Sequence, residues 1–129
     1  MDAKALEAIP LFAGLSRKER EHVAQRADDV DIAPGTQLMK QGRFAHEFFV
    51  ILEGTVEVAK DGEHVADLGP GDFFGEIALV ENERRTATVI TTSPVTAMVM
   101  HGRDFAEMRS ELPHVAEKVH EAIRERLPR

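Results

Sequence analysis

The middle of the chain, from Val30 to His101, is a series of short β-favouring runs separated by pairs of turn-forming residues. This texture predicts many short strands joined by tight turns, and it leaves little room for long helices in that region. The turn pairs are Pro34-Gly35, Glu53-Gly54, Asp61-Gly62 and Pro70-Gly71.

Two segments indicate how these strands should pack. Residues 55–58 alternate polar with apolar side chains, and Asp61-Gly62 can adopt the positive φ of a tight turn, so we expect an antiparallel hairpin with residues 65–68. Residues 48–52 are continuously apolar, as expected of a strand covered on both faces. The chain therefore has the sequence of a mainly β domain of the barrel or jelly-roll type.

Helical patterns flank this region on both sides. Ser16 followed by Glu19 forms a capping box, which predicts a helix over residues 17–27. After Arg103 the helical period returns, and Pro113 suits the first turn of a C-terminal helix of about four turns. One apolar stripe of that helix could pack on the β region, form a dimer seam or act as a mobile lid; it contains Leu112, Val115, Val119, Ala122, Ile123 and Leu127.

Composition limits the class of partner. The 129 residues suit one domain, and the net charge of −7 would repel DNA or RNA. There is no run of about 18 apolar residues that would suggest a membrane span. The absence of cysteine and of a secretory N-terminus makes the cytoplasm the expected location.

Residues 73–89, FFGEIALVENERRTATV, combine several features of an anion site. Gly75 permits a close backbone approach, and the helical turn that follows it offers free N–H groups to an anion. Arg85 supplies a fixed planar fork for a phosphate, and Thr86 adds a hydroxyl donor beside it. Because Glu76 would repel a phosphate, we expect its carboxylate to accept hydrogen bonds from sugar hydroxyl groups.

This segment resembles the phosphate-binding cassette of the cyclic-nucleotide-binding domains, the family found in the catabolite activator protein, protein kinase A regulatory subunits and cyclic-nucleotide-regulated channels. The cassette has the form F-G-E-[IL]-A-L, a variable loop and then R-[TSA]-A-[TS], which residues 74–79 and 85–88 match. Further similarity lies in IPLF at 9–12, PG at 34, QG at 41, FFVILEG at 48–54 and LGPGDFFGE at 68–76.

The resemblance implies a role for each cassette residue. Glu76 would bond the ribose 2′-hydroxyl, and Arg85 with Thr86 would bond the cyclic phosphate. Arg85 is preferred to Arg84 because the second arginine is the phosphate ligand in the channel branch, which this chain resembles at that point. The expected ligand-binding residues are Phe74, Gly75, Glu76, Ile77, Ala78, Arg85, Thr86 and Ala87.

The resemblance also implies the fold and the function. We expect a single domain, 1–129, in which a double-stranded β-roll (29–101) carries the cassette (73–88) and is flanked by an N-terminal helical segment (1–28) and C-terminal helices (102–129). It should bind a 3′,5′-cyclic purine nucleotide, cyclic AMP before cyclic GMP, and relay occupancy through the C-terminal helices. The output is expected to be a regulatory signal delivered to a second copy, a parent protein or a partner. We expect the domain to have no cofactor, no metal and no catalytic residue.

Two other functions remain open. A chain of this fold could be a ligand-free interaction domain that keeps the cassette without using it. A jelly roll could also be a cupin-like metalloenzyme, but the six histidines form no H-x-H or H-x-x-x-H pair, and no arrangement suggests a catalytic nucleophile.

Overall fold

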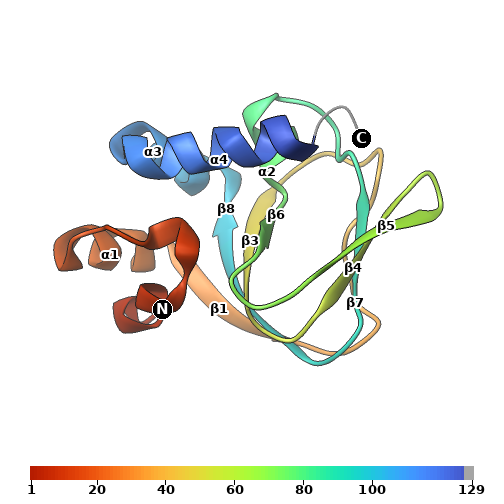
Figure 1. Ribbon diagram of the computed structural model, residues 1–129, viewed down its shortest axis with the longest axis horizontal. Helices are drawn as coiled ribbons and strands as arrows, with labels where there is room; N and C mark the ends of the chain where they lie inside the picture. Colours follow the sequence, from red (N-terminus) through yellow and green to blue (C-terminus); the bar gives the residue numbers. More distant parts are fainter. Residues whose placement is uncertain (127–129) are drawn as a thin grey trace.

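Two four-stranded antiparallel sheets form the centre of the molecule in a computed structural model, which describes residues 1–126 (Figure 1). One sheet has the strand order β1-β8-β3-β6 and the other the order β2-β7-β4-β5. This arrangement confirms the predicted β-roll with flanking helices. The strands are β1 (Ala27–Ile32), β2 (Gln37–Met39), β3 (Glu47–Glu53), β4 (Val56–Lys60), β5 (Glu63–Leu68), β6 (Phe73–Phe74), β7 (Thr88–Thr91) and β8 (Val95–His101).

The predicted hairpin is the β4–β5 pair. Val56 lies opposite Leu68, and the two strands are antiparallel. Asp61 and Gly62 form the turn with φ angles of 54° and 80°, so both turn residues adopt the left-handed conformation that matches the twist of the strands. The turn is fixed to the loop after β2, because the Gln41 amide donates to Asp61 Oδ1 at 2.8 Å and accepts from the Asp61 N–H.

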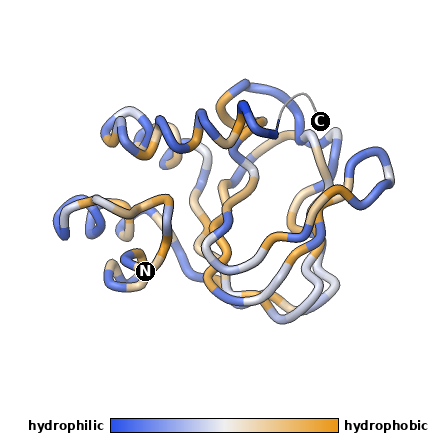
Figure 2. The backbone as a smooth tube through the Cα atoms, viewed as in Figure 1, coloured by the Kyte–Doolittle hydropathy of each residue, from blue (hydrophilic) through white to orange (hydrophobic). Residues whose placement is uncertain are grey.

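The β3 strand is buried on both faces, as its apolar run predicts. Phe48 and Val50 pack into the core beneath the helices, whereas Phe49 and Ile51 pack between the two sheets. All four residues are at most 4% exposed. Because alternate residues of β3 belong to the two cores, this strand joins the helical core to the core of the roll. In Figure 2 the helices alternate between hydrophilic and hydrophobic residues along the tube, as expected when one side of each helix is buried.

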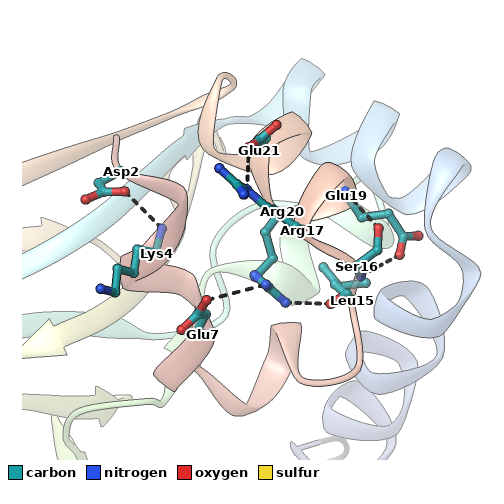
Figure 3. A network of polar contacts seen from close by, with 9 residues as sticks. All are labelled: Asp2, Lys4, Glu7, Leu15, Ser16, Arg17, Glu19, Arg20 and Glu21. Atoms are coloured by element: carbon teal, nitrogen blue, oxygen red, sulfur yellow. Dashed lines mark hydrogen bonds and ion pairs between the residues drawn. The ribbon is translucent and has the colours of Figure 1, made fainter.

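The N-terminal segment contains two 3-10 helices, η1 (Ala3–Ala8) and η2 (Pro10–Phe12), and then α1 (Arg17–Ala24). The predicted capping box is present: the Glu19 N–H donates to Ser16 Oγ at 3.1 Å, and the Ser16 N–H donates to Glu19 Oε1 at 2.8 Å (Figure 3). However, α1 ends at Ala24, whereas the sequence predicted a helix to residue 27. It stops early because Ala27 pairs with Met100 as the first residue of β1.

Two helices, α3 (Gly102–Glu111) and α4 (Pro113–Arg126), follow the roll. Pro113 is the first residue of α4, as predicted. Val115, Val119 and Ile123 from its apolar stripe are at most 4% exposed and pack into the core with α1 and α3, so this stripe serves internal packing. Leu127, which we also assigned to the stripe, lies outside the described residues. None of the helices within residues 1–126 is long and apolar enough to cross a membrane.

Candidate ligand-binding site

One cavity of about 180 Å³ is lined by all eight residues that the sequence analysis assigned to ligand binding. They come from β6, from the short helix α2 (Glu76–Val80) and from the segment just before β7. The two halves of the cassette are thus brought together, although a loop separates them in the sequence. The cavity residues from these segments are Phe74, Gly75, Glu76, Ile77, Ala78, Arg85, Thr86 and Ala87.

The start of α2 is open to an anion. Gly75 occupies the N-cap position with φ 91°, and no side chain caps the helix there. The first N–H groups of a helix lack partners within it, so an anion in the cavity can accept from them. A Cβ on Gly75 would lie 3.0 Å from both Arg85 Nη1 and the Glu47 carbonyl oxygen, so glycine is required for space as well as for its φ angle.

Arg85 is held in place from two sides. Its side chain is buried, and it donates from Nη1 to the Gly75 carbonyl at 2.9 Å and from Nη2 to the Glu47 carbonyl at 2.6 Å. An arginine has five N–H donors, so these two bonds leave others for a ligand. Burial lowers the pKa of Arg85, but a guanidinium starts so high that it stays charged.

Arg84 points away from this site. Its side chain is exposed, lies 4.6 Å from the ring centroid of Phe44 and donates to the Gly42 carbonyl at 3.2 Å. Neighbouring residues in an extended segment project to opposite sides, which explains why only Arg85 lines the cavity. Of the two arginines, Arg85 lines the cavity, and its role as the phosphate ligand stays a prediction.

Glu76 is fully buried, with 0% of its surface exposed. Burial raises the pKa of its carboxyl group above the ordinary value, and the positive charge of Arg126 opposes this rise. Arg126 Nη1 bonds Glu76 Oε1 in a close ion pair, whereas Oε2 is buried without a partner. A buried acceptor without a donor costs free energy, which marks Oε2 as a place where a ligand hydroxyl group could bind.

Sequence reasoning missed several cavity residues. The apolar ones come from β2 and the β4–β5 hairpin, and the charged ones are Lys60 and Arg126. Among the described lining residues, Lys60, Arg85 and Arg126 are positive and only Glu76 is negative, so the cavity has a local excess of positive charge in an acidic chain. The apolar residues are Met39, Val58, Val65, Ala66 and Leu68.

The arrangement offers no alternative metal centre. Within residues 1–126 there is no group of three His, Asp or Glu side chains placed to hold a metal ion. The cavity itself combines cationic side chains, an uncapped helix start and a buried carboxylate, which are groups that can donate to an anion and accept from a hydroxyl group.

Comparison with known families agrees with this geometry. The family described as cyclic nucleotide-binding domain matches residues 29–111, which include most of the roll, every cavity residue except Arg126, and α3. The chain belongs to this family. The family is a regulatory cyclic nucleotide-binding domain, not an enzyme, and the segment of this chain that resembles its cassette supplies eight of the residues that line the cavity.

Relatives of this cyclic nucleotide-binding domain include channels and kinase subunits. A cyclic nucleotide-gated potassium channel of Rhizobium etli is 31% identical over 92% of the chain, which covers 33% of the channel. A cAMP-dependent protein kinase regulatory subunit of Mycosarcoma maydis is 34% identical over 89% of the chain, or 24% of that subunit. The domain thus spans a third or less of the length of these relatives.

Solved structures show the same fold. The regulatory subunit of a cAMP-independent protein kinase A from Trypanosoma brucei superposes with a TM-score of 0.84 at 25% identity, covering 92% of this domain and 43% of that chain. The Thermus thermophilus catabolite activator protein gives a TM-score of 0.80 at 24% identity, covering 92% of this domain and 58% of that chain. The arrangement of roll and flanking helices is therefore shared across the family.

Proposed function

We propose that this domain binds a 3′,5′-cyclic purine nucleotide, cyclic AMP in preference to cyclic GMP, and passes on its occupancy through the C-terminal helices. Glu76 accepts from the ribose 2′-hydroxyl, Arg85 and Thr86 donate to the cyclic phosphate, and the Ile77 and Ala78 amides approach that phosphate. The names of the kinase relatives favour cyclic AMP, because they are cAMP-dependent subunits.

One observation carries this proposal: a buried carboxylate, a buried guanidinium and an uncapped helix start line the same small cavity. Taken singly, each feature is common in proteins. Together they match a ligand that has one negative charge and a neighbouring sugar hydroxyl group, because the guanidinium neutralises the phosphate and the carboxylate accepts from the sugar.

The route for the signal runs through α4. Its last residue, Arg126, reaches the cavity, and its buried stripe continues into the core shared with α1 and α3. A ligand that binds two arrangements of these helices unequally shifts their populations. The receiver of this signal would be a second copy, the parent protein or a partner.

A nucleoside without phosphate is a second candidate. The regulatory subunit of a cAMP-independent protein kinase A from Trypanosoma cruzi, 27% identical with a TM-score of 0.82, was solved bound to guanosine. Arg85 favours a phosphate in the present domain, because a guanidinium buried in the cavity without an anionic ligand would forgo its strongest interaction. A guanosine titration separates the two candidates.

Isothermal titration calorimetry of the purified chain with cyclic AMP, cyclic GMP and guanosine tests the proposal. We expect the cyclic nucleotides to bind and cyclic AMP to bind more tightly. At a ligand concentration near 100 times Kd, the free energy of unfolding should rise by about 2.7 kcal/mol. No heat and no thermal shift with either cyclic nucleotide would overturn the proposal. Binding of guanosine alone would then favour the second candidate, and binding of none of the three would favour a ligand-free interaction module.

A further inference from the structure

The end of α4 closes the cavity through one side chain, that of Arg126. Its Nη1 bonds Glu76 Oε1, its Nη2 donates to the Phe73 carbonyl at 2.8 Å, and its guanidinium carbon lies 5.2 Å from the Phe73 ring centroid. Glu76 begins α2 and Phe73 begins β6, so three contacts tie the last turn of α4 to the cassette. Figure 1 shows this end of α4 beside α2, over the mouth of the roll.

With Arg126 in this position, neither oxygen of the Glu76 carboxylate is open to a ligand, because Oε1 is bonded to Arg126 and Oε2 is buried. Glu76 is 0% exposed although it lines the cavity, and its free oxygen, Oε2, is also buried. An incoming hydroxyl group cannot hydrogen-bond to an atom that has no accessible surface. The cavity of about 180 Å³ is also smaller than the roughly 300–1,000 Å³ of typical small-molecule sites, so in this state it offers less room than such sites usually do.

The last turn of α4 can move without disrupting the core. Ile123 is the final buried apolar residue of α4 among those described, and Arg126 lies one turn beyond it with 28% of its side chain exposed. Among residues 124–126, Arg126 makes the contacts with the cassette, through its polar bonds and the Phe73 ring. Segments with few buried apolar contacts open at lower free-energy cost than the core does.

We propose that the Arg126–Glu76 ion pair is an autoinhibitory contact: Arg126 occupies the carboxylate that the sugar hydroxyl needs, and the ligand binds by displacing it. This inference rests on the proposed function. Release of Arg126 frees the last turn of α4, so occupancy of the cavity becomes a change at the end of the chain's C-terminal helix. A partner that binds only when Arg126 is held away from Glu76 raises the affinity for the ligand. By linkage, the ligand raises the affinity for that partner by the same factor.

The test compares Arg126→Ala with Arg124→Ala. Arg124 is exposed on the same helix, so its removal changes the charge equally without touching the cavity. Because the wild type must break the ion pair before it binds, calorimetry should show Arg126→Ala binding cyclic AMP about three- to thirty-fold more tightly than the wild type. Arg124→Ala should bind within about two-fold of the wild type.

A second measurement follows the helix itself. Hydrogen exchange of the amides at the end of α4 should accelerate when cyclic AMP is added to the wild type, and it should already be fast in ligand-free Arg126→Ala. Equal or weaker binding by Arg126→Ala, beside a wild type that binds, overturns the autoinhibitory contact and leaves the proposed function standing. A failure of the proposed function gives a different result, because neither the wild type nor either variant would then bind a cyclic nucleotide.

Discussion

Arg85 Nη1 donates a hydrogen bond to the carbonyl oxygen of Gly75 at 2.9 Å, which joins the proposed phosphate ligand to the glycine that starts α2. The same guanidinium donates to the Glu47 carbonyl in β3. The two halves of the cassette and one strand of the roll are therefore fixed by a single side chain. A substitution of Arg85 should therefore alter both the charge in the cavity and the position of the start of α2.

Replacing Arg85 with alanine should abolish measurable binding of cyclic AMP. A desolvated phosphate without its cationic partner costs roughly 3–5 kcal/mol, or on the order of a hundred- to several-thousand-fold in affinity. Arg85→Lys should be nearly as damaging, because an ammonium group cannot reproduce the planar fork that spans two carbonyls and a phosphate. Calorimetry measures the affinities, and circular dichroism checks that each variant is folded.

Arg84→Ala is the matched control for this prediction. Arg84 is exposed, and its contacts with Phe44 and the Gly42 carbonyl lie outside the cavity, so the ligand would lose only a long-range attraction. Its affinity for cyclic AMP should fall by well under about ten-fold, chiefly at low salt. If Arg84→Ala loses binding and Arg85→Ala keeps it, the phosphate ligand is Arg84 and our assignment to Arg85 is wrong.

Gly75→Ala should destabilise the domain and weaken ligand binding. The added Cβ would meet Arg85 Nη1 and the Glu47 carbonyl oxygen at 3.0 Å, in a backbone with φ 91° that alanine rarely adopts. We expect a loss of about 1–3 kcal/mol in the free energy of unfolding, measured by urea denaturation. Gly62→Ala has a similar φ of 80° but nothing within 4 Å, so it should show the backbone strain alone and keep the wild-type affinity.

The free energy of unfolding of the domain should depend on pH through the buried carboxyl group of Glu76. Its folded pKa is raised, so between the unfolded and folded pKa values the folded state holds more protons than the unfolded state. The stability that Glu76 contributes is therefore lost as pH rises. The free energy of unfolding of the wild type, relative to Glu76→Gln, should begin to fall as pH rises through about 4.3, the ordinary pKa of glutamate, and should level off above the raised folded pKa.

Urea denaturation of both proteins at a series of pH values checks this expectation. Other titrating groups are shared by the two proteins and cancel in the difference, so the comparison isolates Glu76. A difference that stays flat or rises with pH would mean that Glu76 ionises in the fold as readily as in the unfolded chain.

Local patterns in the sequence predicted most of the fold. The Asp61-Gly62 turn, the apolar run at 48–52 and the Ser16–Glu19 capping box each depend on residues close together in the chain, and each is present in the structure. The end of α1 was predicted three residues too late. It depends on the long-range pairing of Ala27 with Met100, which helical periodicity does not report.

The candidate site also contains residues that local sequence patterns predicted and one, Arg126, that depends on a long-range contact. The cassette residues are contiguous or nearly so, and their order and spacing were sufficient to place them at one cavity. Arg126 was missed because its partner, Glu76, lies 50 residues earlier, and their contact depends on how α4 crosses the roll. Its spacing of three from Ile123 was an available signal, since it places a cation on the buried side of the helix.

The role of Glu76 in reading the sugar can be tested with 2′-deoxy cyclic AMP. The wild type should bind this ligand about ten- to a hundred-fold more weakly than cyclic AMP, because a buried carboxylate loses its hydroxyl donor. In Glu76→Gln most of this discrimination should disappear. The substitution also breaks the ion pair with Arg126, but that release changes the affinities for both ligands by the same factor and cancels in their ratio. Calorimetric titration of the two proteins with the two ligands gives the coupling free energy between Glu76 and the 2′-hydroxyl group. If both proteins lose the same affinity when the hydroxyl group is missing, Glu76 does not contact the sugar.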